Sequence, residues 1–233
     1  MKTLALEREP VDAHASLAHV SRIGPNAIIQ LAEAGERQLG PAAVQALFRR
    51  SGLSRYLAEP PTAMVDEEEV IALHRALRAA HPPEVVRAVS WEAGLLTGDY
   101  ILANRIPKPA QLVLRLLPAR LAARALTTAI TKHAWTFAGS GRFRAVSMFP
   151  LRLEIADSPI CRGERSTTPL CDYYAGTFTR LYQRLVDRRW RIVETHCGAV
   201  AFGEGRGVCV FEVAAGGAES GPANARVPRE ETT

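Results

Sequence analysis

The sequence contains no uninterrupted apolar run that is long enough to span a bilayer. Its first residues, MKTLALEREPVDAH, also lack the apolar stretch of a secretory signal, because charges occupy those positions. These two absences predict a cytoplasmic protein, in which thiols stay reduced. Aromatic residues make up only 6% of the 233 residues, but 47% of the chain is hydrophobic, which is sufficient for one sizeable core.

Acidic residues are missing from a long central segment. No Asp or Glu occurs from Tyr100 to Leu153, although the whole chain has 24 of them and a formal net charge of +5. A segment with charge of one sign creates a local positive field. We therefore expect an anionic ligand, partner or membrane surface, with a peripheral membrane contact as one form of it; a solvated basic face is the alternative. The cations of this segment are Arg105, Lys108, Arg115, Arg120, Arg124, Lys132, Arg142, Arg144 and Arg152.

Hydrophobic periodicity and turn residues divide the chain into two halves. Helical spacing predicts helices over 25–39, 41–50, 66–81 and 84–103, and a further helical stretch to 134 that Pro118 should kink or split. Residues 142–156 alternate like strands, with Pro150 indicating an edge or a bulge; a helix over 172–186 and strands at 190–194 and 208–213 follow. We therefore predict an α+β fold, with a helical N-terminal half and an antiparallel sheet with one helix in the C-terminal half.

The same patterns predict one domain over residues 21–213, with the metal-binding part in 142–213. Residues 1–20 show no clean period and are expected to be loosely ordered. The tail over 214–233 is rich in Ala, Gly, Pro and Glu and is expected to be disordered.

The chain has only four cysteines, and none of them forms the paired C-x-x-C motif of familiar zinc sites. In a reducing compartment, four cysteines nevertheless favour metal binding over disulfides, with buried metal-free thiols as the alternative. We predict a closed metal site whose ligands lie at the ends of a helix and two strands: Cys171, Glu194, Cys197 and Cys209.

This ligand set indicates both the metal and its role. Sulfur ligands favour zinc over magnesium or calcium, and four protein ligands leave no open position for water or substrate, so the zinc is structural. Residues 194 and 197 point to opposite faces of a straight strand, so the chain must bend between them, and Gly198 permits a bend. Two alternatives stay open. Either Cys161 or His196 replaces one ligand, or all four cysteines hold an iron–sulfur cluster, which would make the protein redox-active.

The segment from Pro169 to Cys209 resembles the 4-vinyl reductase domain, which also occurs in the sensor regions of phenol-responsive transcription activators. In those sensors a PxC motif, a Glu 23 residues later and a Cys three further on bind zinc together with a final Cys. Pro169-Leu170-Cys171, Glu194 and Cys197 keep that spacing here, whereas Cys209 follows a longer turn than in the sensors. The resemblance therefore implies zinc and leaves Cys209 as the least certain ligand.

A wider resemblance covers about residues 20–213. The runs AGLLTGDYILANRIP (93–107), HAWTFAGSG (133–141) and CDYYAGTFTRL (171–181) are similar to the bacteriochlorophyll 4-vinyl reductase family of photosynthetic bacteria. This resemblance implies a role in bacteriochlorophyll synthesis, a tetrapyrrole ligand and a fold related to the TRAPP-subunit type.

The family name implies reduction of the 8-vinyl group of the tetrapyrrole, which needs a source of hydride or electrons. The Gly-rich run 203–207 joins two predicted strands and does not open a helix, and the run 139–141 precedes a strand, so neither has nucleotide-binding geometry. We therefore favour a non-catalytic carrier that presents a bacteriochlorophyll precursor to a biosynthetic enzyme. A true vinyl reductase, and a regulatory or scaffold protein that binds small aromatics or pathway enzymes, are the alternatives. No DNA-binding helix is indicated, and we expect no nucleic-acid partner.

A magnesium tetrapyrrole, such as a magnesium porphyrin or a protochlorophyllide, is a flat apolar plate with acidic side arms. Its binding site needs aromatic faces, an axial ligand and cations. Each candidate has a plainer role in the core or at a helix end, and a homodimer stays open. The candidates are Trp91, Tyr100, Trp135 and Phe137 as faces, His133 or His74 as the imidazole, and Arg105, Lys108 or Lys132 as the carboxylate partner.

Overall fold

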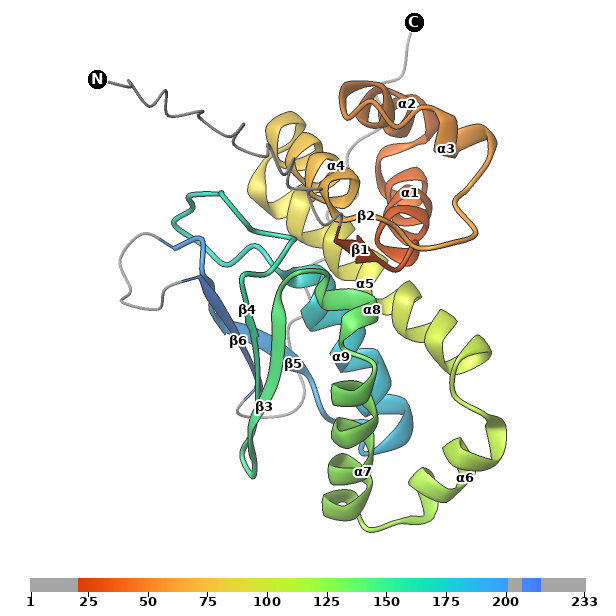
Figure 1. Ribbon diagram of the computed structural model, residues 1–233, viewed down its shortest axis with the longest axis vertical. Coiled ribbons are helices and arrows are strands. Elements are labelled where there is room, and N and C mark those ends of the chain that lie inside the picture. Colours follow the sequence, from red (N-terminus) through yellow and green to blue (C-terminus); the bar gives the residue numbers. More distant parts are fainter. Residues whose placement is uncertain (1–20, 201–206, 215–233) are drawn as a thin grey trace, which may run out of the picture.

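The computed structural model describes residues 21–200 and 207–214, so the predictions for 1–20, for most of the turn at 203–207 and for the tail from 215 lie outside the described residues. Helices occupy one part of the molecule and a four-stranded sheet the other (Figure 1), which confirms the α+β class. None of the described helices combines the length and the apolar character that crossing a membrane requires.

The helical half forms as its prolines and glycines predict. Its helices are α1 (Asn26–Leu39), α2 (Pro41–Arg50), α3 (Arg55–Ala58), α4 (Glu67–Ala80), α5 (Pro83–Asn104), α6 (Lys108–Leu116), α7 (Ala119–Lys132) and α8 (Trp135–Ala138), with a short pair of strands, β1 (Arg22–Ile23) and β2 (Val65–Asp66). Pro118 ends α6 and precedes α7, which confirms the predicted split. Asp66 caps α4 by accepting a hydrogen bond from the Glu68 amide.

The sheet has the strand order β3–β4–β6–β5, and all neighbours are antiparallel. Its strands are β3 (Arg142–Met148), β4 (Leu151–Ala156), β5 (Ile192–His196) and β6 (Val208–Val213), and α9 (Asp172–Leu185) lies between β4 and β5 in the chain. Pro150 lies in the turn between β3 and β4, where no ladder hydrogen bond is required. The register shift that was expected near Pro150 occurs earlier, between Ala145 and Ser147.

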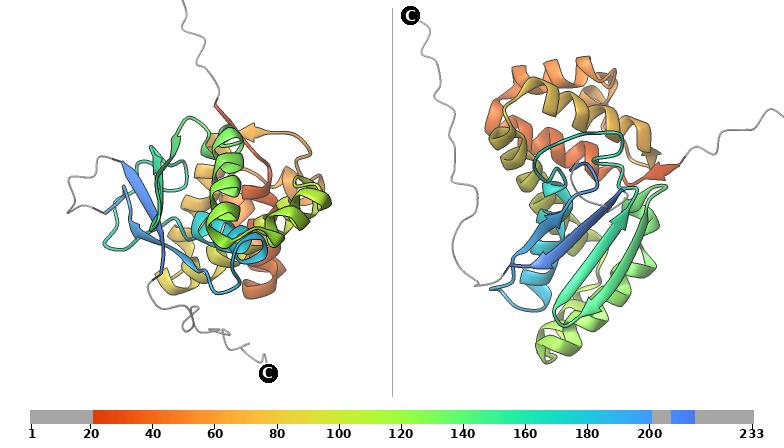
Figure 2. Two further views of the ribbon diagram at one scale, coloured as in Figure 1. Left: turned by 90° about the horizontal axis from the view of Figure 1, so that it is seen from below. Right: turned by 90° about the vertical axis from the view of Figure 1, so that its left-hand side faces the viewer.

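One face of the sheet is apolar and the other is charged. Leu151, Leu153 and Ile155 alternate along β4 and are buried. Helices α7 and α9 lie behind the sheet in the right-hand view of Figure 2. On the other face Glu154 pairs with Arg152 and Arg144, at 3.4 and 2.6 Å. This alternation gives the antiparallel sheet one packed and one solvated face.

Helices α5 and α9 pack with their backbones in close contact. A Cβ atom at Gly94 would lie 2.2 Å from the carbonyl oxygen of Tyr173, and one at Gly176 would lie 2.5 Å from the carbonyl oxygen of Trp91. No side chain fits at either position. Glycine therefore permits the approach that holds the helical half against α9, and both glycines belong to the runs that carry the family resemblance.

We predict that Gly94→Ala lowers the free energy of unfolding by about 1–3 kcal/mol or more, because the added methyl group meets backbone that cannot yield as a side chain can. Urea unfolding followed by circular dichroism measures the loss. Asp99→Ala on the same helix is the matched control; it removes a half-exposed ion pair with Arg180 and should cost less than about 1 kcal/mol. Equal stability of Gly94→Ala and the parent protein would contradict the close packing.

Candidate metal centre

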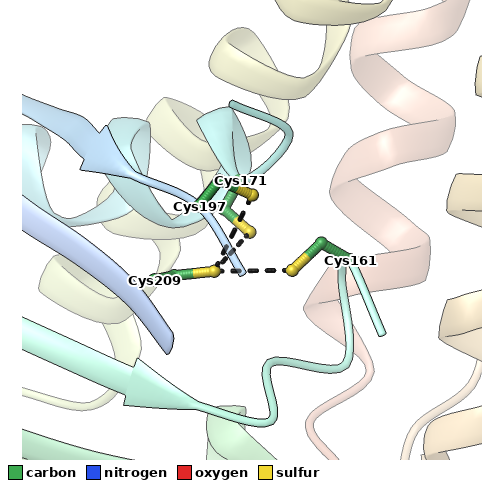
Figure 3. Close-up of side chains that lie close together, drawn as sticks. All are labelled: Cys161, Cys171, Cys197 and Cys209. Atoms are coloured by element: carbon green, nitrogen blue, oxygen red, sulfur yellow. Dashed lines mark hydrogen bonds between the residues drawn. The ribbon is translucent and has the colours of Figure 1, made fainter. Parts of the chain in front are cut away.

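The four cysteines meet at one buried point. Their sulfur atoms all lie within 4.8 Å of one another, and all four residues are buried. The Cys209 sulfur is 3.4 Å from that of Cys161, 3.5 Å from that of Cys171 and 3.9 Å from that of Cys197. The four side chains come from separate segments and point toward a shared centre (Figure 3). A tetrahedral ion with Zn–S bonds of about 2.3 Å needs sulfurs about 3.8 Å apart, so the spacing fits one ion.

Regular structure positions two of the four sulfurs. Cys171 is the residue that begins α9, where the helix dipole favours a negative sulfur. Cys209 is the second residue of β6 and pairs with Ile155 of the neighbouring strand β4. The sheet and α9 therefore fix these sulfurs before the two loop cysteines are placed.

Cys197 follows the end of β5, where the chain bends as predicted. The register between β5 and β6 shifts between Glu194 and His196, and Cys197 accepts a hydrogen bond from the Val200 amide in a tight turn. The close approach of the two chain segments requires the glycine after it, since a Cβ at Gly198 would lie 2.6 Å from the carbonyl carbon of residue 207. The bend brings the Cys197 sulfur and the Glu194 carboxylate to the same region.

Cys161 lies in the loop between β4 and α9, and this loop is fastened to the helical half. Arg162 donates to the buried carboxylate of Glu67 on α4 at 2.7 Å and to the carbonyl oxygen of Asp157 at 2.7 Å. Glu164 pairs with Arg75 of α4 at 2.8 Å. These charge-assisted bonds hold the fourth sulfur in place and connect the cysteine cluster to α4.

Glu194, the predicted carboxylate ligand, lies beside the cluster. Its Oε2 accepts a hydrogen bond from the Cys171 amide at 2.7 Å, so it caps the start of α9. Its Oε1 is buried and has no hydrogen-bond partner among the described residues. The structure thus brings together Cys171, Cys197 and Cys209 as predicted, adds Cys161, and leaves one carboxylate oxygen unpaired next to the sulfurs. His196 stands outside the group of sulfurs.

The electrostatics of the cluster favour a cation. Burial raises the pKa of the Cys171 thiol well above its usual range. Burial and the neighbouring Cys197 raise the pKa of the Glu194 carboxyl as well. Hydrogen bonding to Cys171 and the other thiols lowers the pKa of Cys161. A divalent cation would reverse the cost of ionisation, because coordination deprotonates thiols outright.

The pigment-binding candidates are distributed over four helices. His74 on α4 is 1% exposed, and its ring meets the edge of Tyr173 at 5.7 Å. Phe137 on α8 packs on Phe143 and Phe178 at 5.4 and 6.0 Å. Burial of His74 means that a macrocycle reaches this histidine only if α4 and α9 move apart.

The remaining candidates are nearer the surface. The Arg191 guanidinium lies 4.4 Å from the ring of Trp91 on α5, and that of Arg105 lies 5.9 Å from the ring of Tyr100 at the end of the same helix. His133 follows α7 and is exposed, as are Lys132, Lys108 and Arg105. Trp135 begins α8 and is 61% exposed.

Sequence comparisons match both the cysteine segment and most of the chain. The model of the 4-vinyl reductase domain family matches residues 151–215, which contain all four cysteines. The bacteriochlorophyll synthase 23 kDa chain of Cereibacter sphaeroides is 50% identical over 198 residues, 85% of this chain and 92% of that protein. The protein of the same name from Rhodobacter capsulatus is 43% identical over 190 residues, 82% of this chain and 85% of that protein. An uncharacterized protein of Methanocaldococcus jannaschii is 34% identical over 74 residues, 31% of this chain and 44% of that protein.

The buried histidine makes stability depend on pH. Burial and the nearby Arg78 lower the pKa of His74 to about 3. Because the unfolded chain takes up this proton near pH 6.5, the contribution of neutral His74 is present above that pH and is lost as the pH falls toward 3. At about pH 5 the expected loss is about 2 kcal/mol.

We predict that His74→Gln removes this dependence, so that the difference in unfolding free energy between parent and variant shrinks by about 2 kcal/mol from about pH 7.5 to about pH 5. Urea unfolding at a series of pH values provides the measurement. The exposed His133→Gln is the control and should follow the parent profile. Parallel profiles for the parent and His74→Gln would show that His74 does not titrate as its burial requires.

Proposed function

The chain belongs to the family of the bacteriochlorophyll synthase 23 kDa chain, and from that premise we propose that it acts in bacteriochlorophyll biosynthesis as a zinc-stabilised protein that binds a tetrapyrrole precursor. The observation that supports this most strongly is the similarity to two such chains over more than four-fifths of the sequence. Their name describes one chain of a synthase, and a protein of this kind works beside other enzymes of the pathway. We propose that this chain presents the pigment to such an enzyme.

The proposed zinc site rests on the geometry of the cysteine cluster. Zinc binds thiolates tetrahedrally, and sulfurs 3.4–3.9 Å from that of Cys209 fit this arrangement. An iron–sulfur cluster places its cysteines on different iron atoms and therefore needs sulfurs further apart. Since the ligands are buried and four in number, the ion has no open position, and its role is to hold α9, the sheet and the Cys161 loop together.

The fourth ligand is either Cys161 or Glu194, beside Cys171, Cys197 and Cys209. The sulfur of Cys161 lies among the other three, which favours a site of four sulfurs. Glu194 then acts from outside the site, through the amide of Cys171, to orient a ligand. In the alternative, Glu194 binds the ion through its unpaired Oε1 and Cys161 stays a buried thiol.

The pigment proposal rests on the residues at the junction of α7 and α8. His133 and Trp135 are exposed and two positions apart, and Lys132 precedes them, so an imidazole, an indole face and a cation are available to one ligand. An exposed indole offers a large apolar face at low cost in entropy, and the ammonium group of a lysine pairs with a carboxylate. Trp91, Tyr100 and Arg105 are further proposed contacts. His74 and Phe137 support the site from the core.

We predict that Cys171→Ser lowers the zinc content of the purified protein from one ion per chain to near zero and lowers the free energy of unfolding by at least about 3 kcal/mol. Elemental analysis and thermal unfolding provide the two measurements. Thr195→Ala, on the exposed side of β5, should keep both zinc and stability within about 1 kcal/mol. An unchanged melting temperature after chelation would remove zinc from the proposal.

Cobalt substitution distinguishes the two candidate fourth ligands. The sulfur-to-cobalt absorption band loses about a quarter of its intensity in Cys161→Ser, and none in Glu194→Gln, if the site has four sulfurs. The opposite pattern would assign the fourth position to Glu194.

We predict that the protein quenches the fluorescence of magnesium protoporphyrin saturably, and that Trp135→Ala and His133→Ala each weaken this binding about tenfold. His81→Ala at the end of α4 is the control. Absence of saturable binding of either magnesium protoporphyrin or protochlorophyllide would exclude the carrier function.

The match to the 4-vinyl reductase domain family favours vinyl reduction as a second candidate function. The same protein incubated with a divinyl pigment and NADPH or reduced ferredoxin distinguishes the two functions. A carrier returns the pigment unchanged, whereas a reductase yields the monovinyl product.

A further inference from the structure

Helix α6 (Lys108–Leu116) presents its apolar residues to solvent and a polar residue to the protein. Leu112, Val113 and Leu116 are 58, 57 and 77% exposed, whereas Gln111 is buried. The Gln111 amide donates to the carbonyl oxygens of residues 102 and 106, which satisfies the end of α5. Packing against α5 therefore fixes α6 with its apolar side outward. Such an exposed apolar strip indicates a surface that contacts another phase or molecule.

Other exposed apolar side chains lie at the same end of the molecule. Helix α6, the start of α7 and the tip of the β3–β4 hairpin all reach the lower end in Figure 1, and the view from below in Figure 2 agrees. The Arg120 guanidinium at the start of α7 lies 5.3 Å from the ring of Phe149 in the hairpin turn, which joins these two elements. Six of the seven large exposed apolar residues of the described chain belong here, and we call them the apolar end: Leu112, Val113, Leu116, Leu121, Val146 and Phe149.

Cations surround the apolar end without acidic partners. The acid-free segment supplies exposed cations on α6 and α7, and none of them forms a salt bridge within the described part of the chain. The nearest acids on α9 and α5 are neutralised, since Asp187 pairs with Arg189 and Asp99 pairs with Arg180. The unpaired cations are Lys108, Arg115, Arg120, Arg124 and Lys132.

We propose that the apolar end docks on an anionic lipid bilayer, with Leu112, Val113, Leu116 and Phe149 in the interfacial region and the cations on lipid phosphates. Apolar side chains on one side of a helix with Lys and Arg beside them are the composition of interfacial helices. A protein interface would instead surround an uncharged core with a rim of both signs. The long side chains of Arg120 and Arg124 can keep their charges among headgroups while their stems contact apolar groups. This docking does not depend on pigment binding.

Cosedimentation of the full-length protein with vesicles tests the proposal. We expect binding to phosphatidylcholine vesicles enriched in phosphatidylglycerol, weak binding to phosphatidylcholine alone, and weakening by salt. Leu112→Asp with Leu116→Asp should abolish binding, and the melting temperature should stay unchanged because both side chains are exposed.

Charge position is tested by two variants with the same net charge. Arg120→Glu with Arg124→Glu should weaken binding tenfold or more, whereas Arg49→Glu with Arg50→Glu, at the exposed end of α2, should have little effect. Equal losses in these two variants would reduce the effect to net charge and overturn the proposal. It is also overturned if the leucine variant still binds, or if the leucine variant loses a dimer of the lipid-free protein, which would assign the apolar end to a second copy.

Discussion

The convergence of four cysteine sulfurs within 4.8 Å is the constraint on which the C-terminal half depends. The sulfurs come from the start of α9, from β6, from the turn after β5 and from the loop after β4. An ion bound among them would fix all four segments at one point. Through the pairing of Arg162 with Glu67, that point is also connected to α4. The cluster therefore sits where the sheet, α9 and the helical half meet, and it does not line a substrate cavity.

The contact between α5 and α9 gives the family resemblance a structural meaning. Gly94 and Gly176 lie in the sequence runs that resemble the bacteriochlorophyll 4-vinyl reductase family, and each permits backbone contact between the two helices. In the third run, the carbonyl oxygen of Phe137 accepts the hydroxyl of Tyr174 from α9. The residues that carry the resemblance thus hold the architecture, and the resemblance bears more directly on the shared fold than on a shared ligand.

Most of the fold was predictable because local signals dominate it. Prolines and glycines mark the ends of α1, α2, α5, α6 and α7, and period-two alternation marks β4. Three of the cysteines at the metal centre were predictable because each lies at the end or start of a regular element. Cys161 was only an alternative, since it lies in a loop whose path depends on Arg162, Glu164 and their partners on α4. No periodicity encodes such long-range ion pairs. The outward orientation of α6 was unpredictable for the same reason, because the hydrogen bonds of Gln111 to the end of α5 determine it.

The account gives the chain two separate regions, a buried centre that stabilises it and a surface that meets its ligands and neighbours. X-ray absorption at the zinc edge of the purified protein tests the first of these most directly. We predict one zinc per chain with four sulfur neighbours at about 2.3 Å. A shell made mainly of nitrogen and oxygen, or a folded protein without zinc, would contradict it.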